Sequence, residues 1–248
     1  MIQNDYISVG NGLTVSTANG AVELNNAYNS ISGPLTANIG SAALIVINSG
    51  ALTLGNTTAG AVTLDTSAAN AAITANGTNS ITGAISANAG GNAVTLRNSI
   101  DTTLGNTTAA SLNLFTDNNA NVTSTGTNTV GTLSAQMGNG ALSFTNQGTL
   151  SLGNTSVGSA SFTSNGGAIN LAAGNTVTAN AGNITLTANA IGIDGNMSAS
   201  DTVRVGTFDA ALNISLGGQA DLAVSNASLA RLRNSLTVSS SNDSISSI

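Results

Sequence analysis

The chain has 248 residues, and five small or short polar types, Ala, Asn, Thr, Ser and Gly, account for 166 of them. It contains four Arg, nine Asp and one Glu but no Lys, His or Cys, so the usual general bases, thiol nucleophiles, Schiff-base lysines and imidazole or thiolate metal ligands are missing. The net charge of -6, with four scattered cations, also argues against binding of nucleic acid or of an anionic membrane.

The start of the chain and its cysteine content bear on its location. The first ten residues, MIQNDYISVG, have neither the basic nor the apolar region of a secretory signal peptide, so we expect a mature fragment, an engineered piece or a protein whose signal lies elsewhere. The longest fully apolar run, residues 42–47, is far shorter than the roughly 20 residues that span a bilayer. The absence of Cys favours a bacterial exported protein that crosses membranes unfolded.

Short strands are expected along the whole chain. Apolar and polar residues alternate in segments that recur at residues 52–54, 62–64, 94–96, 112–114, 184–186 and 212–216. This alternation is the period of a strand with one buried face. Gly, Asn and Asp gather between these segments about every eight to twelve residues and supply the turns. The regular apolar positions argue against a disordered linker.

An internal repeat with a period near fifty residues organises the sequence. The segment LTLGNTT at residues 52–58 returns as TTLGNTT at 102–108 and as LSLGNTS at 150–156. A second segment keeps the same step, since NSISGPLTAN at 29–38 matches NSITGAISAN at 79–88. Two different segments that recur with the same period indicate stacked structural repeats.

Strand length and composition favour a parallel β-helix over a β-propeller. Propeller blades need longer antiparallel strands with aromatic contacts, whereas the expected strands are short and the chain has no Trp. We therefore expect an all-β fold, a parallel β-helix (β-solenoid) with short strands, three strands per coil and about two coils per 50-residue repeat. Positions that the repeat makes equivalent are expected to form an inward core stack of Leu64, Leu114 and Phe162.

Three regions are expected along the chain. Residues 1–200 form the repeat β-helix, with repeats near 7–51, 52–101, 102–149 and 150–200. Beyond them the repeated segments vanish and three of the four Arg appear, so residues 201–238 are expected to form the atypical terminal coils that solenoids commonly have. Arg231 and Arg233 mark a possible end contact, and residues 239–248 are expected to be a flexible tail.

Asn56, Asn106 and Asn154 occupy the same place in the three copies of the Leu-Gly-Asn-Thr motif. Asparagine tolerates a left-handed backbone at a tight corner, and its amide can bond to the equivalent Asn of a neighbouring coil or to the local main chain. We therefore expect these residues to form a structural ladder. N-glycosylation is the alternative, because Asn56 and Asn106 begin formal acceptor sequences, although a chain so rich in Asn and Thr contains such sequences by composition alone.

The repeats resemble those of a known family. The run ALTLGNTT at residues 51–58, with the Val-Thr-Leu, Ile-Thr and NSITGAISA segments that follow it, is similar to repeats of filamentous-haemagglutinin-like proteins, which are large bacterial exoproteins secreted by two-partner or autotransporter routes. The resemblance covers about residues 7–200 and implies a right-handed parallel β-helix, export to the cell surface, and a role in adhesion or as a stalk. The chain has no secretion domain at its N-terminus and is short for such a family, so we expect a fragment or a short relative.

A non-catalytic role follows from the distribution of charged residues. A polysaccharide hydrolase needs two carboxylates about 5 to 9.5 Å apart, but most Asp residues stand singly in expected turns. One concentration of charged residues occurs, formed by Asp194, Asp201, Arg204 and Asp209. The segment Asp194-Gly-Asn196 lacks the ligand spacing of a calcium loop, so no enzyme activity, cofactor or metal is expected. Aromatic platforms for sugars are not expected either, since the chain has two Tyr and four Phe.

The favoured function is thus an extracellular structural or adhesive rod of a bacterial exoprotein, at the cell surface. Three alternatives stay open: a self-assembling filament subunit that stacks end to end, an ice-binding protein, and a polysaccharide-active enzyme. Ice binding would use flat outward ladders of threonines, such as Thr53 with Thr103 or Thr57 with Thr107. The expected partners are a cell-surface or matrix component, or other copies of the chain end to end, with no nucleic acid and no membrane insertion.

Overall fold

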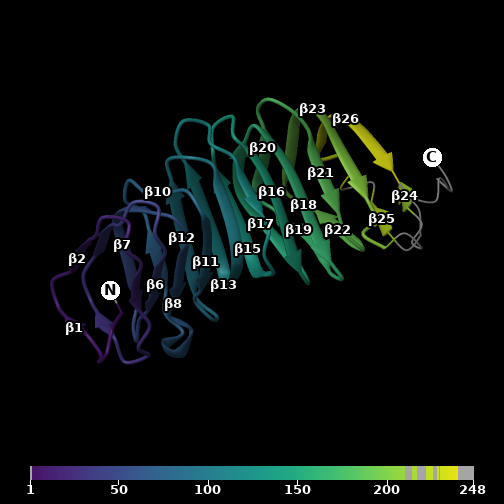
Figure 1. Ribbon diagram of the computed structural model, residues 1–248. Coiled ribbons are helices and arrows are strands. Elements are labelled where there is room, and N and C mark those ends of the chain that lie inside the picture. Colours follow the sequence, from purple (N-terminus) through teal and green to yellow (C-terminus); the bar gives the residue numbers. More distant parts are fainter. Residues whose placement is uncertain (1, 210–213, 217–221, 226–227, 229, 240–248) are drawn as a thin grey trace. The chain divides into compact units, whose positions relative to one another are not determined.

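The computed structural model describes residues 2–209, 214–216, 222–225, 228 and 230–239, and its regular structure is almost wholly β-strand (Figure 1). Among the described residues the strands pair in parallel, and the strands of residues 8–206 pair with one another one coil apart along the chain. The predicted all-β parallel β-helix is therefore confirmed as a β-solenoid of stacked coils. The chain divides into two compact units, residues 1–128 and residues 129–248.

Short strands joined by tight turns form the coils of the first unit. They are β1 (Ser8–Val9), β2 (Leu13–Ser16), β3 (Val22–Leu24), β4 (Ser30–Ile31), β5 (Leu35–Asn38), β6 (Leu44–Ile47), β7 (Leu52–Ala59), β8 (Val62–Asp65), β9 (Ile73–Ala75), β10 (Ser80–Ile81), β11 (Ala84–Asn88), β12 (Ala93–Asn98), β13 (Thr102–Thr116) and β14 (Val122–Ser124), with a 3-10 turn, η1 (Ser67–Ala69), after β8. Turns between them use residues with a positive φ, among them Gly40 at 64° and Asn70 at 47°. Glycine and asparagine tolerate this left-handed backbone, which explains their abundance between the strands.

Two ladders of inward side chains build the core of the first unit. The first runs through Leu13, Leu35, Leu54, Ala75, Leu96 and Leu114. The second runs through Val22, Leu44, Val62, Ile85 and Leu104. Apart from Leu13, every member is at most 3% exposed. Burial of a Leu, Ile or Val side chain stabilises a fold by roughly 1.5–3 kcal/mol, so these ladders are the main source of stability.

The coils are shorter than the sequence repeat suggested. Paired residues of the first unit stand 18 to 23 positions apart, as in Leu44 with Val62 and Val62 with Ile85. A fifty-residue step therefore contains about two and a half coils rather than two. The half coil places equivalent residues on opposite ladders, so that Leu54 belongs to the first ladder and Leu104 to the second.

The second unit repeats this construction with longer strands. They are β15 (Asn128–Gln136), β16 (Ala141–Gln147), β17 (Leu150–Val157), β18 (Ser159–Asn165), β19 (Ala168–Leu171), β20 (Thr176–Ala179), β21 (Ile184–Thr187), β22 (Ala190–Ile193), β23 (Asn196–Gly206), β24 (Ile214–Leu216), β25 (Leu222–Val224) and β26 (Leu232–Ser239). One inward ladder joins Leu133, Leu152, Leu171 and Ile193. Another joins Leu142, Ala160, Ile184 and Val203.

The residues predicted as one core stack are all buried, but they do not stack on one another. Leu64 is 1% exposed and aligns with Val46 and Ala87 on the strands of the second ladder. Leu114, 2% exposed, aligns with Leu96 in the first ladder. The prediction of a single stack is wrong in this respect because the repeat advances by a half-integral number of coils. Phe162 lies in the second unit, 0% exposed, between Phe144 and Leu186.

The end of the second unit departs from the regular ladders. β24 pairs with β25, and β26 pairs with β23. Arg233 lies in β26 opposite Ser198, and Arg231 is exposed in the turn before that strand. The backbone carbonyl of Arg231 accepts a hydrogen bond from Met197 N at 3.3 Å, so this turn is fixed to β23. Of the residues expected to form a tail, Ser239 ends β26 and 240–248 lie outside the described residues.

Candidate functional site

The three asparagines of the Leu-Gly-Asn-Thr motif lie at exposed corners of the coils. Each Oδ1 accepts a hydrogen bond from a backbone N–H one coil further on. The distances are 2.9 Å for Thr78 N to Asn56, 2.8 Å for Thr127 N to Asn106 and 3.0 Å for Thr176 N to Asn154. The asparagines stand two and a half coils apart and do not bond to one another. Of the two partners expected for them, an equivalent Asn and the main chain, each bonds to the main chain, at a residue of the next coil.

Glycine at these corners lets neighbouring coils approach closely. A Cβ atom added to Gly77 would lie 2.7 Å from the carbonyl carbon of Gly55, and one added to Gly126 would lie 2.3 Å from that of Gly105. Gly55 and Gly105 are the glycines of the motif itself. The motif thus joins successive coils by backbone contact and an asparagine hydrogen bond.

A second set of asparagines, which the sequence reasoning missed, is buried between the strands. Asn48, Asn98 and Asn146 are at most 2% exposed and keep the same repeat step. Each Oδ1 accepts a hydrogen bond from the N–H of an apolar residue 16 or 17 positions earlier in the chain. The donors are Ile31 for Asn48 at 2.8 Å, Ile81 for Asn98 at 2.9 Å and Val130 for Asn146 at 2.8 Å. Each Nδ2 donates to the carbonyl of that same residue, at 3.1 to 3.2 Å. The side-chain amide thus pairs with the backbone N–H and carbonyl of Ile31, Ile81 or Val130, as the main chain of a neighbouring strand would do.

Further buried asparagines also donate hydrogen bonds to the main chain. Asn29 and Asn79 are 0% exposed, and the Asn79 amide donates to the carbonyls of Gly77 at 3.2 Å and Arg97 at 2.9 Å. The threonines expected to form outward ladders are divided between the core and the surface. Thr57 and Thr107 are at most 1% exposed, so the expectation that they form an outward ladder is wrong. Outward ladders of Thr do occur, since Thr53 aligns with Thr74 in the first unit.

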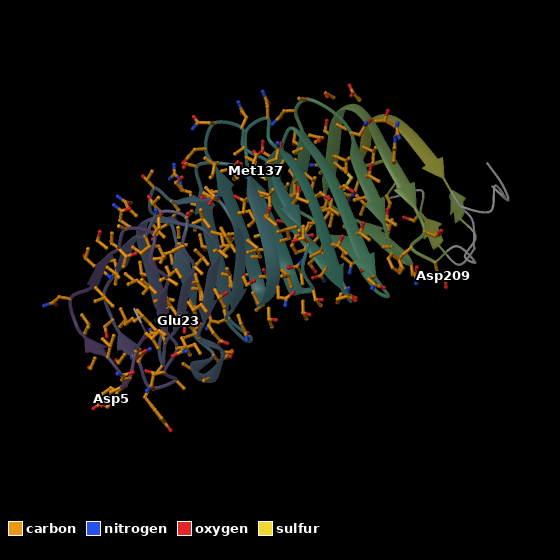
Figure 2. The ribbon with its side chains drawn as sticks, in the orientation of Figure 1. Asp5, Glu23, Met137 and Asp209 are labelled. Carbon is orange, nitrogen blue, oxygen red and sulfur yellow. The ribbon has the colours of Figure 1, made fainter. Side chains whose placement is uncertain are left out.

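The aspartates are used at turns or in pairing rather than gathered in one site. Asp65 accepts hydrogen bonds from the N–H of Ser67 at 2.8 Å and from its hydroxyl at 2.7 Å, and Asp101 accepts one from Asn121 N at 2.8 Å. Figure 2 shows three of the acidic residues, Asp5 and Glu23 on the first unit and Asp209 on the second. The described part of the chain contains no group of three or more acidic residues, His or Cys that could hold a metal ion.

The charged concentration singled out in the sequence is spread over the second unit. Asp194 follows β22, whereas Asp201 and Arg204 both lie in β23, where Arg204 aligns with Thr185. Asp209 follows that strand, and its N–H donates to Asn189 Oδ1 at 3.0 Å. Asp194 thus belongs to one ladder of the unit and Arg204 to the other, so the sequence cluster does not correspond to one pair of adjacent strands.

An ion pair joins two strands of the first unit. Arg97 in β12 aligns with Phe115 in β13, and its guanidinium reaches Asp117 just beyond that strand. The distances are 3.2 Å from Nε to Oδ2 and 2.6 Å from Nη2 to Oδ1, so the contact is bidentate. The hydrogen bond from Arg97 lowers the pKa of Asp117 below its ordinary value, and it raises the pKa of Arg97.

The ion pair predicts a pH dependence of stability. Because the pKa of Asp117 is lowered in the folded state, the pair stabilises the fold above the carboxyl's unfolded pKa of about 3.9, and this contribution is lost as the pH falls through the folded pKa. We expect Asp117→Asn to melt at a lower temperature than the wild type at neutral pH and at the same temperature in strong acid. The shift is expected to be small, because exposed pairs are screened by solvent. A constant difference from neutral pH to strong acid would contradict this role.

A groove on the second unit is a further candidate site. It has a volume of about 410 Å³ and is lined by Thr132, Ser151, Asn170, Asn175, Gly192 and Asp194, with Leu152, Leu171 and Ala172 beside them. The strands that supply these residues are β15, β17, β19 and β22, which are successive neighbours in the sheet. Hydroxyl, amide and carboxylate groups therefore face one hollow over four coils.

No family model, curated protein or solved structure matches this chain. The repeat fold thus follows from the structure, while the resemblance to filamentous-haemagglutinin-like proteins rests on the repeat residues alone. As for membranes, no helix among the described residues combines the length and the hydrophobicity needed to cross a bilayer.

Proposed function

We propose that this chain is a non-catalytic structural and adhesive β-solenoid of a bacterial exoprotein, which acts outside the cell as a stalk or surface-fibre region. The observation that carries the proposal is the repeated use of polar side chains to join coils. The corner asparagines represented by Asn56 and the buried asparagines represented by Asn98 make the same hydrogen bonds in three copies each. A chain whose polar residues are committed to stacking is suited to a stiff, regular scaffold.

The chemistry of the surface supports the absence of catalysis. The chain has no His, Cys or Lys to move protons or to act as a nucleophile. The carboxylates of Asp65, Asp101 and Asp117 are engaged by turn N–H groups or by Arg97. A surface of hydroxyls and amides with little charge forms many weak contacts instead of one strong one.

Attachment through such a surface depends on the number of copies. Linking several weak sites raises the effective concentration of each, and overall avidity can exceed a single affinity by about 10²–10⁴. The resemblance to filamentous-haemagglutinin-like repeats supports a location at the bacterial surface, where many copies are displayed together.

The proposal is tested by comparing valency, turnover and location. We expect a bead-coupled multivalent form to attach to cells at least about 10²-fold more strongly than the single chain, and neither form to cleave neutral or acidic polysaccharides. We also expect antibodies to label intact bacteria that express the protein. Cleavage that disappears in Asp201→Asn or Asp209→Asn would revive an enzyme, and labelling only after permeabilisation would contradict the surface role.

A further inference from the structure

The groove on the second unit presents a row of polar side chains in strict register. Thr132 aligns with Ser151, Ser151 with Asn170, and Asn170 with Gly192. Neighbouring strands lie about 4.8 Å apart, so the row extends over roughly 14 Å. Asp194 lies two residues beyond Gly192 and adds a carboxylate at the last coil of the groove.

The hollow exists because the row ends on a glycine. A Cβ atom at Gly192 would lie 3.0 Å from Asn170 Oδ1, so any side chain there would fill the space beside that amide. Gly192 does not have a positive φ, which means that the backbone itself does not require glycine at this position. The missing side chain therefore opens the groove without relieving any strain.

The polar groups of the row are available to a ligand. Asn170 and Asp194 are exposed, and Thr132 and Ser151 are half-buried. The side chains of these four residues make no hydrogen bond to another residue in the part of the chain that the structure describes. Asn175, in contrast, donates from Nδ2 to the carbonyl of Leu152 at 3.2 Å and fixes the wall of the groove.

The composition of the groove selects a class of ligand. Leu152 and Leu171 are at most 1% exposed and no aromatic side chain lines the groove, so it offers no large apolar side chain as an anchor to a peptide, whose binding depends mainly on buried apolar and aromatic anchors. Its charged side chain is a carboxylate, and the chain carries a net charge of -6, both of which disfavour an anionic polymer. A neutral polyhydroxylated chain matches hydroxyl, amide and carboxylate groups, which can donate to and accept from sugar hydroxyls.

We infer that this groove binds a neutral glycan chain, laid across β15, β17, β19 and β22, with Asn170 and Asp194 as its principal polar contacts. No aromatic side chain lines the groove, so single-site affinity is weak and relies on hydrogen bonds that replace those to water. The inference goes beyond the proposed function and can fail by itself, since attachment through other surfaces would survive without it.

The test is a titration of the full chain with six-residue oligosaccharides, followed through its backbone amide resonances by NMR. The neutral probes are β-linked glucose, β-linked N-acetylglucosamine and α-linked mannose, and the acidic probe is galacturonate. We expect at least one neutral probe at millimolar concentration to shift the resonances of Asn170, Gly192 and Asp194. Galacturonate is expected to leave them unchanged.

Variants separate binding in the groove from general effects. Asn170→Ala and Gly192→Val are expected to weaken binding of the neutral probe at least tenfold, the first by removing the amide and the second by filling the hollow. Thr163→Ala, on β18 outside the groove, is the matched control and should bind as the wild type does. Melting temperatures and circular dichroism confirm that each variant is folded. The inference is overturned if no neutral probe shifts these resonances, if galacturonate binds equally well, or if the folded Gly192→Val variant retains full affinity.

Discussion

Leu114→Asp is expected to lower the stability of the first unit by several kcal/mol. Leu114 is 2% exposed and aligned with Leu96 of β12 in the first ladder. Arg97, the next residue of β12, is exposed on the other face of that strand and is already paired with Asp117. A carboxylate at position 114 would lose its hydration without gaining a partner, and breaking a core in this way is among the most costly of substitutions. The measurement is the urea concentration at the midpoint of unfolding.

Thr53→Asp is the matched control for this prediction. Thr53 is half-buried on an outward position of β7, where it aligns with Thr74 in β9. A carboxylate there keeps contact with water, so the expected loss is well below about 1 kcal/mol. Equal midpoints for the two variants would mean that the inward and outward faces of these strands have been exchanged.

The local alternation of residues was enough to predict the fold class. In Val62-Thr63-Leu64 the two apolar residues are buried and the threonine is exposed, as the strand period requires. The step of fifty residues correctly indicated stacked coils, since one segment could recur only if its surroundings recurred too. These inferences depend on short stretches of chain, where backbone geometry alone decides which way each side chain points.

The length of a coil was not predictable in the same way. A sequence repeat shows only that similar surroundings recur after a given number of residues. The surroundings of Leu54 and Leu104 are similar, although the two residues lie on opposite ladders. Two similar faces allow a repeat to advance by a half-integral number of coils. Only the strand pairings, such as Leu44 with Val62 18 residues on and Val62 with Ile85 23 residues on, fix the true length of the coils.

The polar interior and the groove depend on contacts between distant residues. Asparagine is usually exposed, and nothing near Asn98 in sequence indicates that it will lie against Ile81. Its recurrence as Asn48 and Asn146 was a usable signal of a structural role, but not of burial, since the exposed Asn56 recurs with the same step. The groove could not have been foreseen, because the alignment of Gly192 with Asn170 follows from the register alone.

Asn98→Ala is expected to destabilise the first unit by about 2–6 kcal/mol. The substitution removes the partner of both the N–H and the carbonyl of Ile81, which is 1% exposed, and each buried backbone group left without a hydrogen bond costs about 1–3 kcal/mol. The cavity left by the amide adds to this cost. Hydrogen exchange offers a local readout, since the Ile81 amide should exchange faster than the amides of strands away from this corner.

Asn106→Ala provides the comparison that separates burial from hydrogen bonding. Asn106 also accepts one backbone N–H, from Thr127 at 2.8 Å, but it is exposed at the corner of β13, so water replaces the lost contact. The expected loss is therefore about 1 kcal/mol or less, in the range of a single net hydrogen bond. If Asn106→Ala proved as damaging as Asn98→Ala, the buried amide would not be acting as a substitute strand, and the stability of the coils would rest on the Leu-Gly-Asn-Thr corners instead.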